Sequence, residues 1–260
     1  MKKLILFLLS TTILGFSQSI KPKLINNLKI ENDIFAGFDA LNDYYFAKNN
    51  VFFKKTEQNT FEYKNLFFGK ITAIDIQNPL KIVLFYQDFN TIVTLDNQLN
   101  ESQKLNLSDF PIPINAEAFG ISANNSLWIY NSLDNKIGLF NFVKKEYKSI
   151  TIPISQKIKK YNSDFNNFYF VDQNNRFSSC NIYGKLLFLG TIPDFDNLIL
   201  VNSHQIIFSK NNNLFLFDVN KNASTKIEIS EKTIDNFVYK NQILTIFTTQ
   251  QITNYKLILE

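Results

Sequence analysis

The chain has 260 residues, of which 45% are hydrophobic and only 7 are Gly and 6 are Pro, a composition that excludes a low-complexity or disordered chain. Its 27 Lys and Arg residues nearly balance 23 Asp and Glu residues. This balance gives no electrostatic basis for binding nucleic acid, which requires a basic stripe, and little for binding anionic lipid.

The amino terminus has the features of a secretory signal peptide. Lys2 and Lys3 provide a basic start, and the apolar run that follows, Leu4 to Gly15, is shorter than the ~20 residues of a membrane-spanning helix. Small residues before position 18 predict cleavage after Ser17. A buried amino-terminal core helix is the alternative interpretation.

Cleavage would leave residues 18–260 as a single domain with 25 basic and 23 acidic residues, a net charge of +2. No cysteine follows the predicted cleavage site, so a lipid anchor that requires one is not expected. We therefore expect an exported protein of the periplasm or the outer-membrane periphery that is not a lipoprotein and does not insert into the membrane. Cys180 is the only cysteine, so a hydrophobic core must stabilise the domain without disulfides.

The composition favours β-structure, because 27 Phe and 11 Tyr residues suit the half-buried surfaces of strands. Asn-rich segments occupy the turn positions that Gly usually fills. Asn tolerates the left-handed backbone conformation and forms hydrogen bonds with its own chain, so it can replace Gly in tight turns.

One unit recurs along the chain: an apolar triplet, a polar turn, and a second alternating run. The triplets end at Phe46, Tyr86, Tyr130, Val171, Phe208 and Phe247. Successive ends are 37 to 44 residues apart, which is the length of one four-stranded propeller blade. The pattern predicts an all-β fold, a six-bladed β-propeller.

The remaining strands are predicted on both sides of each hairpin. Inner strands are expected at Ile34–Ala40, Ile71–Ile76, Ala116–Ser122, Ile158–Asp164, Leu198–Asn202 and Ile234–Tyr239. Outer strands are expected at Thr60–Asn65, Ser102–Leu107, Glu146–Ile152, Lys185–Thr191 and Ser224–Ile229.

The sixth repeat has no outer strand of its own, whereas one spare strand precedes the first repeat, at Leu24–Ile30. An open ring would expose a strand edge, which promotes aggregation. We therefore expect Leu24–Ile30 to complete the last blade from the amino-terminal side.

In period and pattern, nearly all of the mature chain resembles the six-bladed propellers of the NHL and TolB-like kind. It contains no WD dipeptide, kelch double glycine or Asp-box. A β-sandwich or a β-solenoid is the structural alternative, but a sandwich does not explain six regular periods, and solenoid coils are usually shorter than ~40 residues.

Binding residues of such propellers are expected on the face that carries the turns between the second and third strands of each blade and the connections between blades. Three Asp-Phe pairs fall in these segments: Asp88 and Phe89, Asp109 and Phe110, and Asp194 and Phe195. Either their rings pack between blades, or they form a patch that binds a partner. We take the second interpretation as the hypothesis for the site.

Other candidate residues have structural interpretations. Lys157, Lys159 and Lys160 form a small basic cluster that is more typical of a solvated loop than of a phosphate site. Asp194 and Asp196 are too few for calcium, which takes six to eight oxygen ligands.

Three further single residues are also expected to have no role in binding or catalysis. His204, the only histidine, is predicted in an inner hairpin turn on the opposite face, away from any acid–base constellation. Cys180 is expected to be a small buried hydrophobe, and Trp128 is expected to pack between blades.

We thus expect a non-enzymatic protein–protein interaction module of the bacterial cell envelope, without metal or cofactor, whose partner is an envelope protein or complex. In this respect the chain is similar to periplasmic propellers that serve outer-membrane assembly or secretion machines. A glycan- or small-molecule-binding propeller, including a lyase or hydrolase acting at the channel mouth, is the alternative.

Overall fold

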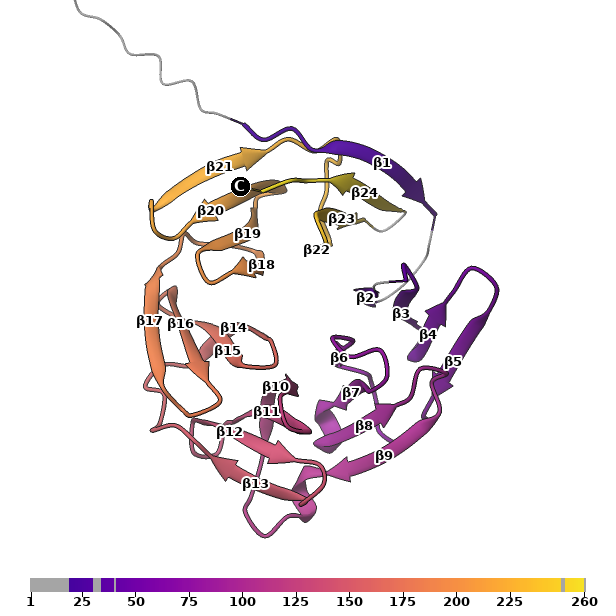
Figure 1. The fold of residues 1–260 in the computed structure, drawn as a ribbon, viewed down its shortest axis with the longest axis vertical. Coiled ribbons are helices and arrows are strands. Elements are labelled where there is room, and N and C mark those ends of the chain that lie inside the picture. Colours follow the sequence, from indigo (N-terminus) through magenta and orange to yellow (C-terminus); the bar gives the residue numbers. More distant parts are fainter. Residues whose placement is uncertain (1–18, 30–33, 40, 249–250, 260) are drawn as a thin grey trace, which may run out of the picture.

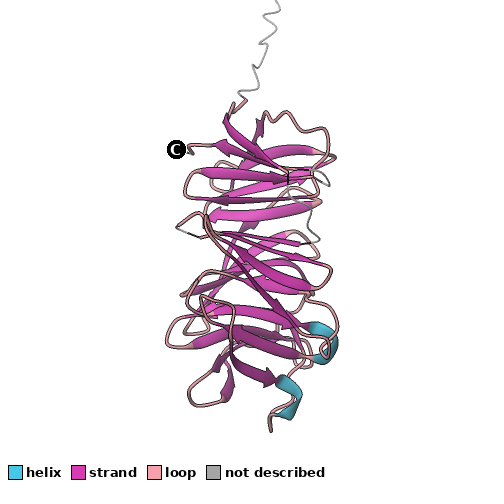
Figure 2. Cartoon of the chain, turned by 90° about the vertical axis from the view of Figure 1, so that its right-hand side faces the viewer, coloured by secondary structure: helices cyan, strands magenta, loops and turns pink. Residues whose placement is uncertain are grey.

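The structure, a computed structural model, describes residues 19–29, 34–39, 41–248 and 251–259. The predicted signal peptide lies outside these residues. The described residues form six four-stranded antiparallel sheets. The sheets stand radially around a central opening (Figure 1) and together make a flat disc (Figure 2). This arrangement confirms the predicted six-bladed β-propeller.

Blades are numbered in chain order, and their strands are given from the innermost to the outermost. Blade 1 consists of β2 (Ile34–Phe38), β3 (Tyr44–Lys48), β4 (Val51–Lys55) and β5 (Thr60–Lys64). Blade 2 consists of β6 (Ala73–Asp75), β7 (Ile82–Tyr86), β8 (Thr91–Leu95) and β9 (Glu101–Asn106). Blade 3 consists of β10 (Ala116–Ser122), β11 (Ser126–Asn131), β12 (Lys136–Asn141) and β13 (Glu146–Ser149).

Blade 4 consists of β14 (Ile158–Ser163), β15 (Asn167–Asp172), β16 (Arg176–Asn181) and β17 (Leu186–Thr191). Blade 5 consists of β18 (Asn197–Asn202), β19 (Gln205–Lys210), β20 (Asn213–Asp218) and β21 (Ala223–Ile227). Blade 6 consists of β22 (Asn236–Lys240), β23 (Ile243–Phe247), β24 (Ile252–Lys256) and β1 (Lys23–Leu28). Two 3-10 helices, η1 (Gln87–Phe89) and η2 (Leu107–Asp109), lie in connections, and no helix of the described residues is long and apolar enough to cross a membrane.

The ring closes as the sequence predicts. β1 pairs antiparallel with β24, with Leu24 opposite Tyr255 and Leu28 opposite Ile252. The last predicted residue of this strand, Ile30, lies outside the described residues. The first and last strands of the described residues, β1 and β24, are therefore held in one sheet, blade 6 (Figure 1).

The segment before β1 extends the closure to a second blade. The Ile20 amide donates a hydrogen bond to the Lys226 carbonyl at 2.8 Å, and the Glu228 amide donates one to the Ile20 carbonyl at 2.8 Å. These bonds form a parallel bridge between Ile20 and Ile227. The amino-terminal segment therefore joins blade 5 to blade 6 along their outer strands.

The tight turns confirm the predicted role of Asn. Of the fifteen non-glycine residues with positive φ among those described, twelve are Asn. Asn49 and Asn50 have φ values of 50° and 61° in the two-residue turn between β3 and β4, and Asn211 and Asn212 have 50° and 57° between β19 and β20. Two positive φ values in a two-residue loop match the twist of the flanking strands, so these Asn pairs fix the register of the hairpins.

Core side chains are packed between neighbouring blades. Trp128 is fully buried at the interface of blades 3 and 4, where its ring centroid lies 6.1 Å from that of Phe168 and its Nε1 donates to the Asp164 carbonyl at 2.9 Å. Cys180 is buried in the same cluster, and burial raises the pKa of its thiol to about 12. Both residues have the structural roles that the sequence predicts.

Closure by β1 makes a direct prediction about stability. Deleting residues 18–30 from the mature chain should cause aggregation or a large drop in melting temperature. The deletion removes β1, the outer neighbour of β24, and so exposes a strand edge and apolar area. A loss of several kcal/mol is comparable with the whole ~5–15 kcal/mol stability of a domain. Thermal melts of the purified proteins measure this effect.

A shorter deletion, of residues 18–21, is the matched control. It removes the bridge to blade 5 but keeps β1, so its melting temperature should lie between those of the mature and the strand-deleted forms. Equal melting temperatures for the mature chain and the form that lacks residues 18–30 would contradict closure by β1.

Candidate functional site

The chain topology brings the three predicted Asp-Phe pairs to one end of the disc. Phe89 ends η1, in the turn between the second and third strands of blade 2. Phe110 follows η2 in the connection between blades 2 and 3, and Phe195 lies in the connection between blades 4 and 5. In an antiparallel four-stranded blade these turns and connections share one face, which we call the connection face.

The three rings differ in exposure. Phe89 is 52% exposed, whereas Phe195 is only 6% exposed and packs with Leu198 and Ile206 in the core between blades 4 and 5. Phe110 is half-buried, with its ring edge-on to that of Phe140 at 4.9 Å between centroids. The expectation of one exposed set of three rings is therefore wrong for Phe195 and only partly right for Phe110, because both rings fill gaps between blades.

The carboxylates of the three pairs also differ. Asp88 and Asp109 are exposed, while Asp194 forms ion pairs with Lys210 at 2.6 Å and with Lys159 at 3.2 Å. The two ammonium groups lower the pKa of Asp194 to about 2, with Lys210 contributing most. Asp196 contacts Lys210 as well, at 3.4 Å. Lysines therefore compensate the carboxylates of Asp194 and Asp196. The described part of the chain contains no group of three or more His, Cys, Asp or Glu side chains that could hold a metal ion.

Phe89 instead lies beside an exposed apolar loop that was not among the predicted site residues. Leu66 is 77% exposed and Phe67 is 80% exposed in the connection between β5 and β6, which belongs to the connection face. The next residue, Phe68, packs edge-on against Phe89 at 6.4 Å between ring centroids. We call Leu66, Phe67 and Phe89 the Phe67 patch. In the sequence, the three consecutive apolar residues Leu66, Phe67 and Phe68 in a connecting segment are the signal from which this exposed loop could have been predicted.

Asparagine side chains hold the Phe67 patch in place. The Asn65 Oδ1 accepts a hydrogen bond from the Phe67 amide at 2.8 Å, which turns the backbone so that the loop projects outward. On the other side, Asn50 donates to the Gly69 carbonyl at 2.6 Å and accepts from the Ile71 amide at 2.8 Å. Gly69 has a φ of +73°, and a Cβ there would lie 3.6 Å from the Phe89 ring. The exposed rings are thus presented by an ordered loop.

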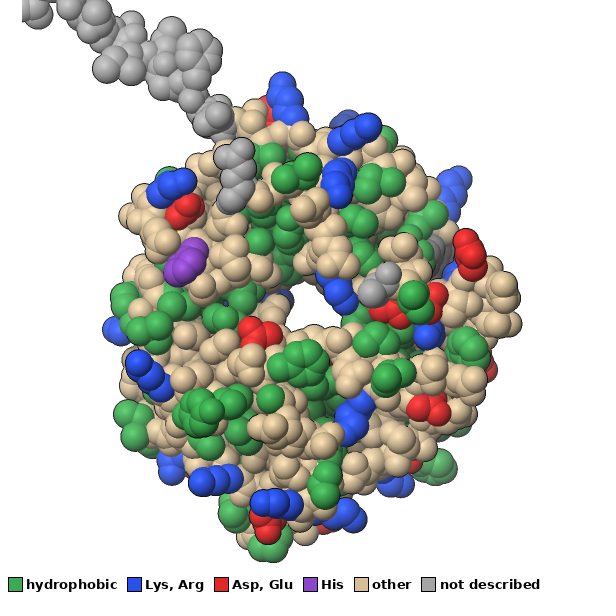
Figure 3. Space-filling model, in the orientation of Figure 1, with side chains coloured by type: hydrophobic (Ala, Val, Ile, Leu, Met, Phe, Trp, Pro, Cys, Tyr) green, Lys and Arg blue, Asp and Glu red, His purple; other side chains and the backbone are tan. Residues whose placement is uncertain are grey.

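A central channel runs through the disc (Figure 3), enclosed by the inner strands of all six blades. Its volume is about 750 Å³. Asp75 lines one end, where its oxygens accept hydrogen bonds from the Gln77 amide at 2.8 Å and the Ile121 amide at 2.7 Å. Burial nevertheless raises the pKa of Asp75 above its usual range.

The basic cluster does not lie in a solvated loop as expected. Lys159 and Lys160 belong to the inner strand β14 and line the channel, and only Lys157 stays in the preceding exposed connection. The strand prediction for Ile158–Asp164 already contained both lysines, so strand alternation was the better guide. His204 lies in the turn between β18 and β19, on the face opposite the connection face, as predicted.

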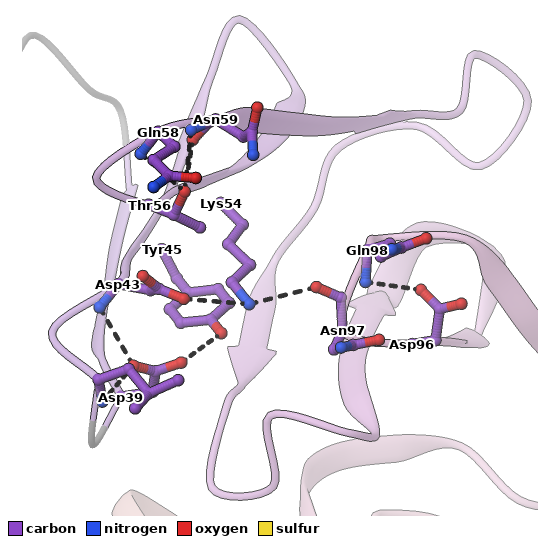
Figure 4. Close-up of polar contacts among 11 residues, drawn as sticks. Asp39, Asp43, Tyr45, Lys54, Thr56, Gln58, Asn59, Asp96, Asn97 and Gln98 are labelled. Atoms are coloured by element: carbon purple, nitrogen blue, oxygen red, sulfur yellow. Dashed lines mark hydrogen bonds and ion pairs between the residues drawn. The ribbon is translucent and has the colours of Figure 1, made fainter.

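A buried polar network joins blades 1 and 2 (Figure 4). Lys54 in β4 forms an ion pair with Asp43 at 3.2 Å and donates to the Asn97 carbonyl of blade 2 at 3.2 Å. Its ammonium lies 5.6 Å from the centre of the Tyr45 ring, and the Tyr45 hydroxyl donates to Asp39 at 2.8 Å. Burial, followed by the hydrogen bond to Asp39, raises the pKa of Tyr45. Lys54 is paired on several sides, so we interpret the network as a structural connection between the blades.

No protein-family model matches the chain, and no curated protein matches it in sequence. Several solved structures have the same fold as this chain. Virginiamycin B lyase from Staphylococcus aureus has a TM-score of 0.58 at 16% identity, over 85% of this chain and 79% of that chain. The β-propeller domain of Cps50 (Swd1) from Myceliophteria thermophila has a TM-score of 0.58 at 8% identity, over 91% and 100%. A luciferin-regenerating enzyme has a TM-score of 0.56 at 11% identity, over 89% and 95%. At these identities the likeness shows the fold alone.

The Lys54 network predicts a large effect on stability. Lys54→Met should destabilise the protein by about 3–5 kcal/mol, because it leaves the Asp43 carboxylate buried without a counterion. Urea denaturation of the purified variant measures the loss, with Lys144→Met at an exposed turn as a control that should stay within ~0.5 kcal/mol of the unmodified protein. Adding Asp43→Asn to Lys54→Met should recover part of the loss. A Lys54→Met variant as stable as the control would show that the pair contributes nothing.

Proposed function

We propose that this protein is a non-enzymatic interaction module of the bacterial cell envelope that holds a partner protein on its connection face. The observation that carries the proposal is the Phe67 patch. Leu66 and Phe67 project into solvent from a loop that Asn65 and Asn50 hold in place, so a partner could bury them without ordering the loop first.

The chemistry of the patch favours a protein partner. Aromatic anchors commonly dominate the binding energy of protein interfaces, and burial of apolar area contributes ~25 cal/mol per Å². The loop connects blades 1 and 2 and η1 lies within blade 2, so the patch is formed by two consecutive blades. The proposal keeps the predicted face and the predicted Phe89, and replaces Phe110 and Phe195 with Leu66 and Phe67.

The cellular setting of the proposal rests on the sequence. The basic start and the apolar run of the first seventeen residues are typical of a signal peptide, so we place the protein in the periplasm or at the outer-membrane periphery. An envelope protein or complex is then the class of partner that the connection face would meet, and an outer-membrane assembly or secretion machine is the kind of complex that the resemblance suggests.

The second candidate function is that of a glycan- or small-molecule-binding propeller, including a lyase or hydrolase. The channel volume of about 750 Å³ favours it, and one of the similar structures is a lyase. Catalysis of this kind needs convergent acid–base groups. Both oxygens of Asp75 are engaged by Gln77 and Ile121, which favours a structural role for this carboxyl group.

The Phe67 patch can be tested with two matched double variants of the tagged mature protein. Leu66→Ser with Phe67→Ser removes the patch, whereas Leu187→Ser with Phe188→Ser removes two exposed apolar residues from β17 at the outer rim. Loss of a binding hot spot costs ~2 kcal/mol or more, so the patch variant should recover at least about tenfold less partner from the native envelope. The rim variant should recover as much as the unmodified protein.

Circular dichroism and thermal melts establish that both variants are folded, which the exposure of all four side chains leads us to expect. A folded patch variant that captures the same partner in full would overturn the proposal. Loss of capture in the rim variant alone would move the binding surface to β17.

A further inference from the structure

The channel has the size of a site for a small molecule, and its wall combines apolar and polar side chains. Its volume of about 750 Å³ lies within the ~300–1,000 Å³ range of ligand pockets, which are mostly apolar with a few placed polar groups. Apolar side chains from four different inner strands contribute to its wall, and polar groups make up about half of it; the apolar residues are Ala36, Ala73, Ile74, Leu200, Val201 and Val238. An apolar ligand body would therefore be in contact on several sides.

The Lys160 ammonium in this wall has a neutral hydrogen-bond partner. Lys160 lines the channel, and its Nζ donates to the Asn197 Oδ1 at 2.7 Å. Among the described residues, no carboxylate forms an ion pair with Lys160. Burial lowers the pKa of Lys160, which reflects the cost of holding an uncompensated charge away from water.

The neighbouring lysines differ from Lys160 in this respect. Lys159, the preceding residue, pairs with Asp194 at the connection face. Lys240 ends the inner strand β22 at the same end of the channel as Asp75; it donates to the Phe38 carbonyl at 3.3 Å, and its charge favours the ionised form of the buried Asp75 carboxyl group. Lys160 is thus the channel lysine whose charge no acidic side chain offsets.

Lys160 is also held in position. Asn197, its acceptor, donates through Nδ2 to the Asn236 Oδ1 at 2.7 Å, and Asn236 accepts from the Phe237 amide at 2.9 Å. This series of hydrogen bonds runs across the inner strands of blades 4, 5 and 6. An ammonium fixed in this way can form a short charge-assisted hydrogen bond without first losing side-chain freedom.

We propose that the central channel binds a small organic anion, with a carboxylate or phosphate group at Lys160 and an apolar body along the channel wall. The anion offsets the uncompensated ammonium, and the body buries against the alanine, leucine, isoleucine and valine side chains of the inner strands. Residues of the Phe67 patch take no part in this site, so its test is independent of the partner-binding test.

Four probes with one eight-carbon body and different heads separate charge from hydrophobicity: octanoate, octyl phosphate, 1-octanol and octylamine. Titration calorimetry on the mature protein should show that at least one of the two anions binds about tenfold or more tightly than octanol, and that octylamine binds more weakly than octanol. The stronger of the two anions indicates whether the ligand carries a carboxylate or a phosphate.

Two variants assign the effect to Lys160. Lys160→Met keeps the length of the side chain and removes its charge, so the advantage of the anions over octanol should disappear while the melting temperature stays equal or rises. Lys157→Met, outside the channel, should bind the anions as the unmodified protein does. The proposal is overturned if neither anion binds at about 1 mM, if octanol binds as tightly, or if Lys160→Met keeps the anion preference.

Discussion

The antiparallel pairing of β1 with β24 is the contact on which the rest of the ring depends. Every other blade is made from consecutive strands, whose hairpins keep them together, but blade 6 combines the first described strand, β1, with the last three, β22 to β24. The bridge from Ile20 to Ile227 extends the same segment onto blade 5. Since the core lies between blades, an opening at one interface exposes apolar side chains on both sides of it. Closure is therefore the condition for a single stable domain.

A closed ring separates the two candidate sites in space and in chemistry. The connection face carries the Phe67 patch, an apolar surface in an ordered loop whose exposed rings suit a protein partner. The channel wall carries Lys160, a charged group among apolar side chains, which suits a small anion. The polar network around Lys54 joins blades 1 and 2 through turns on the face opposite the connection face.

Much of this structure could be predicted from the sequence, because the period of the repeat and strand alternation are properties of the chain itself. The apolar triplets located all six blades, the spare strand at Leu24–Ile30 predicted the closure, and the Asn-rich segments predicted the turns. The burial of loop side chains could not be predicted in this way. Phe89 and Phe195 both follow Asp in connecting segments, yet one is exposed and the other fills a gap between blades, since burial depends on how neighbouring blades meet.

The closure can be tested most directly by a disulfide between β1 and β24. Asn254 Nδ2 donates to Asn26 Oδ1 at 2.8 Å, so cysteines at these two positions, in a Cys180→Ala background, should form a disulfide in the folded monomer and raise its melting temperature. Asn27→Cys with Asn254→Cys is the control, because successive residues of a strand point to opposite faces. The account predicts cross-linking of the first pair and little of the second. Equal cross-linking of both pairs, or a first pair that stays reduced in the folded protein under oxidising conditions, would contradict the closure of the ring by β1.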